Sequence, residues 1–137
     1  MDEPLAITLF SGTDDKLTAA AVLAAGAAAL GRPVHIFLQY WALDAFRASQ
    51  EKRELQVAPE AGAAGRESVE ALAKAGQSSW RETLAGAKEI GEVDVQACSL
   101  SMDLLRLAPE DLDPLVDGVE GVTAFWLAAS EGQVVFI

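Results

Sequence analysis

The chain has 137 residues with a mass of 14.4 kDa, of which 51% are hydrophobic and 23% charged, and this composition predicts one folded domain rather than a disordered chain. The net charge is −11 and the ten Lys and Arg residues are scattered, so we expect neither nucleic acid nor a membrane surface as a partner. The acidic N-terminus lacks the positive charge of a secretory signal, and a single cysteine cannot form an internal disulfide, so we expect a cytoplasmic protein.

The first two elements are a strand and a helix rich in alanine. Residues 4–11 form a short apolar run that is typical of a strand covered on both faces. The run stops at Gly12, and Asp14 is the predicted N-cap of a helix that continues to Leu30. The weakly polar part of this helix, residues 17–30, is shorter than the roughly 20 residues that span a bilayer. We therefore interpret it as a closely packed, buried helix.

The middle of the chain contains one further strand and a segment without a clear pattern. Residues 34–40 are rich in β-branched and aromatic side chains, which predicts a strand, and residues 41–46 follow as a helical turn. Residues 47–76 are charged and then low in complexity, so we predict a mobile excursion that is partly helical over residues 67–74. This excursion is a candidate to cover a reactive group or to dock a partner.

The last third of the chain alternates helices with strands. A helix over residues 80–90, capped by Ser78 or Ser79, precedes a strand over residues 93–97. The elements expected after Cys98 are a helix that ends near Leu107, a helical turn at 109–112, a marginal strand at 115–119, a helix over 121–130 and a strand over 133–137. This alternation predicts a three-layer α/β/α sandwich with a mainly parallel sheet of about five strands.

Ligand sites of such sheets lie outside the carboxyl ends of the strands. This rule brings four turns of the chain to one edge of the sheet: Ser11-Gly12-Thr13, Tyr40-Trp41, Cys98-Ser99 and 118–121. The chemistry is therefore expected along this edge.

Cys98 is the only cysteine, and it stands at the junction between a strand and a helix. Free backbone N–H groups and the positive end of a helix dipole favour the nucleophilic thiolate at such a junction. Ser99 and Ser101 could donate hydrogen bonds to a thiolate or a persulfide, but Ser99 could equally cap the helix. The alternative role for Cys98 is that of a small buried hydrophobe. Its position favours the reactive thiol, and we predict Cys98 as the catalytic residue.

His35 is the only histidine, and its place in the sequence argues against hydrolase or metal chemistry. It lies early in its strand, towards the end opposite Cys98, so we do not expect a Cys/His pair and interpret His35 as structural. One cysteine and one histidine far apart in sequence do not form a usual ligand set. We therefore expect no metal and no cofactor.

The turn at residues 11–14 resembles a shortened phosphate-binding turn, but it lacks both the G-x-G-x-x-G pattern and the lysine of a P-loop. A turn with an N-cap is the favoured interpretation, and binding of a small anion is the alternative. Aromatic residues at the end of the second strand could wall an apolar pocket. The predicted binding residues are Ser11, Gly12, Thr13, Tyr40, Trp41, Ser99 and Ser101.

Three segments together resemble the DsrE/DsrF/DrsH-like family, and most closely its DsrE2-type branch, which is often labelled peroxiredoxin-like. These segments are LAITLFSGTDDK at 5–16, GRPVHIFLQYWAL at 31–43, and VQACSLSMDLL at 95–105 followed by PEDL at 109–112 and DGVEG at 117–121. The resemblance implies a compact α/β domain, commonly a homo-oligomer, that carries sulfane sulfur as a cysteine persulfide. The sulfur-carrying cysteine of the family falls on Cys98. The implied partners are sulfur donors and acceptors, either proteins or small persulfides.

Two features depart from the family pattern. Leu105-Arg106-Leu107 stands where the family often has glycine, and the excursion is rich in alanine where relatives tend to be rich in methionine. Two functions stay open at this point. The first is a sulfur carrier or sulfurtransferase that acts through Cys98. The second is a small-ligand-binding or scaffold subunit in which Cys98 is only structural.

Overall fold

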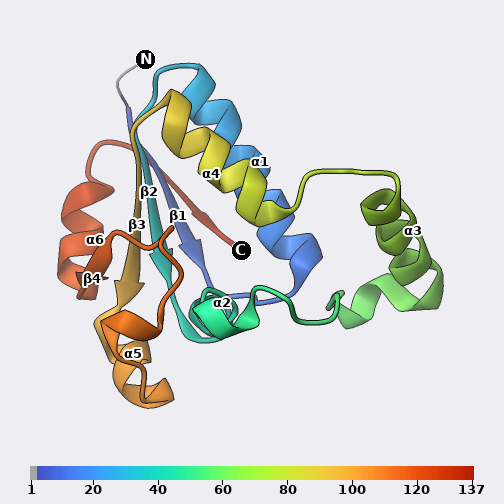
Figure 1. Ribbon diagram of the computed structural model, residues 1–137. Coiled ribbons are helices and arrows are strands. Elements are labelled where there is room, and N and C mark those ends of the chain that lie inside the picture. Colours follow the sequence, from blue (N-terminus) through green and yellow to red (C-terminus); the bar gives the residue numbers. More distant parts are fainter. Residues whose placement is uncertain (1–2) are drawn as a thin grey trace.

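A computed structural model of the chain describes residues 3–137. Its sheet contains five parallel strands in the order β4-β3-β2-β1-β5 (Figure 1). The strands are β1 (Leu5–Leu9), β2 (Val34–Leu38), β3 (Val93–Cys98), β4 (Gly118–Glu120) and β5 (Gln133–Phe136). The expected α/β class and parallel sheet are confirmed.

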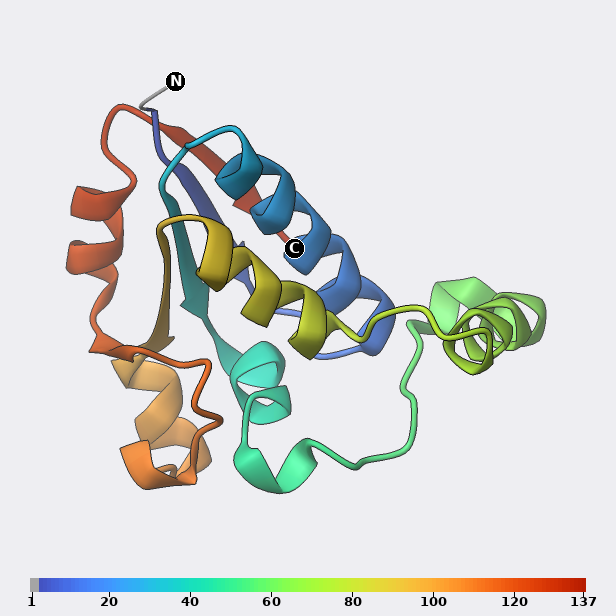
Figure 2. The same ribbon diagram turned by 45° about the horizontal axis from the view of Figure 1, so that its top comes forward.

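The helices lie on both faces of this sheet and along its carboxyl edge. They are α1 (Asp14–Ala29), α2 (Tyr40–Ala45), α3 (Gly62–Lys74), α4 (Trp80–Ile90), α5 (Ser99–Leu105) and α6 (Val122–Ala128). In both ribbon views, α1 and α4 run side by side on one face, α6 lies against the other, and α3 projects beyond α1 (Figures 1 and 2). Among residues 3–137, no helix combines the length and the apolar character needed to cross a membrane.

The main core lies between the sheet and the pair α1 and α4. Alternate side chains of the central strands point into it, and Ile7 and Val95 are completely buried there. The alanine-rich face of α1 adds six buried residues and little bulk, so α1 approaches both the sheet and α4 closely. The expected close packing of this helix is confirmed.

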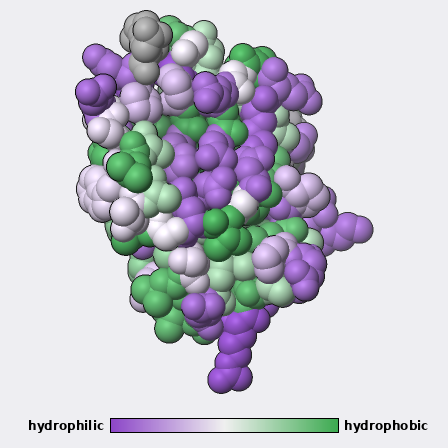
Figure 3. All heavy atoms as spheres, turned by 90° about the vertical axis from the view of Figure 1, so that its left-hand side faces the viewer, coloured by the Kyte–Doolittle hydropathy of each residue, from purple (hydrophilic) through white to green (hydrophobic). Residues whose placement is uncertain are grey.

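The opposite face carries a much smaller core. Ala6, Phe37, Cys98, Phe125 and Ala129 form this cluster, and the Phe37 and Phe125 rings stack with centroids 5.1 Å apart. Figure 3 views the molecule from the side of α6 and shows hydrophilic side chains in the middle of the surface with hydrophobic ones around them. The middle of this surface is therefore polar.

Two element boundaries differ from the prediction because polar groups use the backbone there. The expected strand at 115–119 is a turn followed by β4, since the Asp113 carboxylate accepts from Leu115 N and the Asp113 carbonyl accepts from Val116 N. These N–H groups are therefore not free to pair with β3. In the excursion, α3 begins at Gly62 rather than residue 67. The predicted mobility of this segment stays a prediction.

Three further residues differ at the ends of helices. Thr13, and not Asp14, is the N-cap of α1, because the Asp14 carboxylate binds groups outside the helix. Tyr40 starts α2 with φ 42° instead of continuing the strand. Arg106 ends α5 in the left-handed region at φ 55° and ψ 45°, a conformation that glycine adopts without strain. The departure from the family's glycine thus falls on a residue whose backbone would suit glycine.

Candidate functional site

The carboxyl ends of β1, β2 and β3 open onto the edge of the sheet where α2 and α5 lie (Figure 1). A side chain of α5 joins these two helices, because the Ser101 hydroxyl accepts a hydrogen bond from Tyr40 N at 3.1 Å. Ser101 is 1% exposed, so its hydroxyl stabilises the start of α2 rather than facing a ligand. The predicted site residues along this edge fall into two groups, one after β3 and one after β1.

Cys98 is the last residue of β3 and the N-cap of α5, and its side chain makes no capping hydrogen bond. The residue is 5% exposed and belongs to the apolar cluster with Phe37 and Phe125. Ser99 is the first residue of α5 and is exposed, so the interpretation of Ser99 as the helix cap is wrong. Cys98 therefore has the expected place in the fold, but α6 packs over its side of the sheet.

His35 joins three strands through carboxylates that the sequence analysis missed. Its Nδ1 lies 3.2 Å from Asp94 Oδ2 on β3, and its Nε2 lies 2.5 Å from Glu120 Oε1 on β4. Both ring nitrogens can donate to these carboxylates at the same time only when the imidazole is protonated. Within the described part of the chain, no group of three His, Cys, Asp or Glu side chains is arranged to hold a metal ion.

The turn after β1 lines a cavity of about 360 Å³. Of the predicted binding residues, Ser11, Gly12, Thr13 and Trp41 line it, whereas Tyr40, Ser99 and Ser101 do not. Tyr40 packs against Phe10, a lining residue, with ring centroids 5.1 Å apart. A Cβ atom on Gly12 would lie 2.3 Å from the Trp41 carbonyl oxygen, so only glycine allows this approach.

Arg53 and Lys16 also line the cavity, and the sequence analysis identified neither of them. Arg53 comes from the excursion, and its Nη2 donates to the Gly12 carbonyl at 2.6 Å and approaches Asp14 Oδ1 at 3.4 Å. The sequence carries no local signal for this contact, because the excursion has neither a periodic pattern nor a motif. Only the folded chain brings Arg53 to the turn.

Two consecutive carboxylates at the start of α1 fasten the excursion. Asp14 accepts hydrogen bonds from Gln56 N at 2.7 Å and from Trp80 Nε1 at 2.9 Å, and Asp15 accepts from Ala58 N at 3.2 Å. Burial raises the pKa of Asp15, but hydrogen bonds from backbone N–H groups, that of Ala58 among them, outweigh it and hold the pKa below its ordinary value of 3.8. The carboxylate form thus holds this contact.

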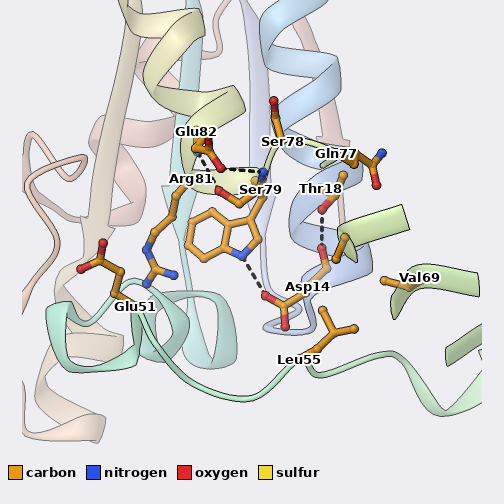
Figure 4. A pocket seen from close by; sticks show the side chains of 12 residues that line it. Asp14, Thr18, Glu51, Leu55, Val69, Gln77, Ser78, Ser79, Arg81 and Glu82 are labelled. Atoms are coloured by element: carbon orange, nitrogen blue, oxygen red, sulfur yellow. Dashed lines mark hydrogen bonds between the residues drawn. The ribbon is translucent and has the colours of Figure 1, made fainter. Parts of the chain in front are cut away.

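A second cavity, of about 570 Å³, lies between α1, α4 and the excursion (Figure 4). Its wall includes the start of α4, where Ser79 caps the helix and exchanges hydrogen bonds with Glu82, as one of the two predicted serines should. From α3, Val69 and Ala73 reach this cavity, although none of the residues of α3 is buried. α3 lies on one side of α1, and α5 and α6 lie on the other (Figures 1 and 2). The excursion therefore does not cover Cys98.

Comparisons with known proteins agree with this fold. The YrkE protein of Bacillus subtilis, which is uncharacterized, is 30% identical over 149 aligned positions that cover 93% of this chain and 92% of YrkE. Among solved structures, the MTH1491 protein of Methanobacterium thermoautotrophicum, of unknown function, superposes with a TM-score of 0.62 at 13% identity over 99% of this chain and all of that one. The ychN protein of E. coli gives a TM-score of 0.62 at 15% identity over the full length of both chains.

The two solved structures share the α/β fold with this protein. Because their sequence identity is low, the similarity shows the fold alone. The sequence profile of the DsrE/DsrF/DrsH-like family matches residues 1–70, which include β1, the turn that lines the cavity, β2 and α2. The similarity to YrkE extends over nearly the whole chain. The protein therefore belongs to the DsrE/DsrF/DrsH-like family.

Proposed function

We propose that the protein relays sulfane sulfur through a persulfide on Cys98. The observation that carries this proposal is the position of the lone thiol, at the carboxyl end of β3 and the start of α5, in a member of the DsrE/DsrF/DrsH-like family. Sites of parallel α/β sheets lie at this edge. One cysteine per subunit is sufficient for a carrier, whereas a dithiol oxidoreductase needs two.

The transfer consists of two thiol exchanges. In the first, the Cys98 thiolate attacks the outer sulfur of a donor persulfide, R–S–SH, and a new S–S bond forms as the old one breaks. The donor leaves as the thiolate RS⁻, which takes the bonding electron pair, and Cys98 holds the outer sulfur as –S–SH. In the second, an acceptor thiolate attacks that outer sulfur and Cys98 leaves as thiolate. Sulfur changes carrier and no external oxidant or reductant is consumed.

The burial of Cys98 adds a structural requirement to this chemistry. Cys98 is only 5% exposed, so a donor has little access to it in this conformation. Phe125 is the side chain of α6 in the apolar cluster of Cys98. The proposal therefore includes an outward movement of α6 when donor or acceptor docks. With a net charge of −11, this chain would favour partners with a basic surface in the cytoplasm.

The direct test is the mass of the intact protein after incubation with inorganic polysulfide. We expect a gain of one sulfur atom that a reductant removes and that is absent from Cys98→Ser. A second incubation with a small acceptor thiol should return the protein to its original mass. Because Cys98 is the only cysteine, a reducible gain that persists in Cys98→Ser would contradict the proposal, and so would an unreactive wild-type chain.

A further inference from the structure

We propose that the cavity after β1 binds a small molecule that carries one oxyanion group, such as a sulfonate or carboxylate, on an apolar body. The cavity holds about 360 Å³, which lies within the range of small-molecule sites. Cys98 is not among its lining residues. The proposal therefore does not rest on sulfur transfer and can fail or succeed independently of it.

The guanidinium of Arg53 is the strongest indication of a ligand. The side chain is 11% exposed, and its Nη2 is used by the Gly12 carbonyl and the Asp14 carboxylate. Its Nε is buried without a hydrogen-bond partner among residues 3–137, and Arg53 lines the cavity. The remaining nitrogen, Nη1, makes no hydrogen bond to residues 3–137 either, but it is not buried, so it can donate to an oxyanion in the cavity.

The other charged groups near the cavity are already paired. Among the lining residues, Asp44 accepts from Arg47 at 2.9 Å, and Lys16 faces Glu60 at 3.3 Å. The Glu60 side chain is 69% exposed, so this surface pair is weak and Lys16 can turn to an anionic ligand. Asp14 and Asp15, at the start of α1, hold the excursion as described above. Among the lining residues, the buried polar atoms without a partner within residues 3–137 are Arg53 Nε and the Thr13 hydroxyl oxygen, and neither is a carboxylate.

The rest of the wall suits an apolar body. Its lining includes the apolar side chains of Phe10, Trp41, Ala58 and Pro59. Trp41 is 55% exposed although it is a large aromatic residue, so a ligand in the cavity could bury more of its ring. Benzenesulfonate combines the required charge with a flat apolar body and serves as the probe.

The test is a titration of the isotope-labelled full chain with benzenesulfonate, followed through the Nε–H signal of Arg53 by NMR. We expect this signal to shift and saturate, with no comparable effect from neutral benzenesulfonamide and weaker binding of inorganic sulfate. The Cys98→Ser variant should bind benzenesulfonate as the wild type does. An Arg53 signal that does not move, or an equal response to the neutral compound, would overturn the proposal.

Matched variants locate the site. Trp41→Ala should weaken binding about tenfold, because it removes an aromatic wall of the cavity. Trp126→Ala is the control, since Trp126 is exposed to 59%, similar to Trp41, but lies on α6 outside the cavity. Arg53→Lys keeps the charge and removes the planar fork of guanidinium donors, so it should also weaken binding. Equal weakening by the two tryptophan variants would assign the binding to a general hydrophobic effect and overturn the proposal.

Discussion

The turns after β1 and β3 have the same local design and opposite surroundings. Each lies at the same edge of the sheet and leads from the carboxyl end of a parallel strand to the start of a helix. The turn after β1 is hollow, because a distant segment that contains Arg53 completes a wall without filling the space. The turn after β3 is packed, because Cys98 is buried in one apolar cluster with Phe37 and Phe125. The edge of the sheet thus decides where a site can lie, and the elements packed on it decide whether a ligand can enter.

The largest effect on stability should come from removing an aromatic side chain from the packed turn after β3. Phe125→Ala removes a ring that is 2% exposed and should lower the free energy of unfolding by about 3–5 kcal/mol, as measured in urea. In the folded variant, Cys98 should react with iodoacetamide at least about tenfold faster, since local opening controls access to a buried group. Trp126→Ala, on the exposed side of the same helix, is the control. An unchanged alkylation rate in Phe125→Ala would show that α6 does not limit access to the thiol.

The next largest effect on stability should come from adding a side-chain atom to the turn after β1, which lines the cavity. Gly12→Ala places a Cβ atom 2.3 Å from the Trp41 carbonyl oxygen, and the resulting backbone shift should cost about 1–3 kcal/mol of stability. The same shift should abolish the benzenesulfonate response of Arg53. Gly86→Ala is the matched control, because no atom lies within 4 Å of its added Cβ in α4, and alanine should stabilise this helix by about 0.5–1 kcal/mol. Thermal unfolding of both variants is the test. A Gly12→Ala variant as stable as Gly86→Ala would contradict the close approach at Gly12.

A smaller effect on stability should follow from weakening the contacts that hold residues 47–76 against the turn after β1. Asp14→Asn weakens the acceptor for Gln56 N and Trp80 Nε1 and should cost about 1–2 kcal/mol. Limited proteolysis within residues 47–76 should become faster, whereas Cys98 alkylation should not change. Glu51→Gln, an exposed change in the same segment, provides the control. Equal proteolysis of the two variants would mean that Asp14 does not hold the excursion.

The strands and the two long helices that frame both turns could be predicted from sequence, because local patterns determine them. Apolar runs marked β1 and β2, and helical spacing with a serine cap marked the bounds of α4. The turn before β4 was not predicted, because Asp113 binds backbone groups and a pattern of apolar residues does not reveal this contact. The start of α3 was missed for another reason, since residues 62–65 contain two glycines and no large apolar side chain to indicate a helix.

The two turns differ in how far sequence could describe them. Ser11, Gly12 and Trp41 were found because each follows a strand end, and the structure brings them to one cavity. Arg53 was missed because its contact with Gly12 depends on the path of a long connection. The cover over Cys98 was missed for the same reason, since α6 crosses from β4 at one edge of the sheet to β5 at the other. Sequence could place a thiol at a strand end, but only the topology shows what packs on it.

The smallest effect concerns acid stability and applies to the hollow turn alone. The pKa of Asp15 is below its ordinary value of 3.8, so its contact with Ala58 N stabilises the fold above that pH and is lost as the pH falls through the lowered pKa. Asp15→Asn should therefore lower stability slightly near neutral pH and flatten the loss of stability below about pH 4, as measured by urea unfolding from about pH 6 to about pH 2.

Glu60→Gln is the control for the loss of stability at acidic pH. The pKa of Glu60 is also lowered, by its own backbone N–H and by Lys16, but this carboxylate is fully exposed and water screens the interaction. Its removal should leave the pH profile nearly unchanged. If Asp15→Asn and Glu60→Gln had equal profiles, the contact between the start of α1 and the excursion would contribute nothing to stability, and the wall of the hollow turn would depend on Arg53 and Asp14 alone.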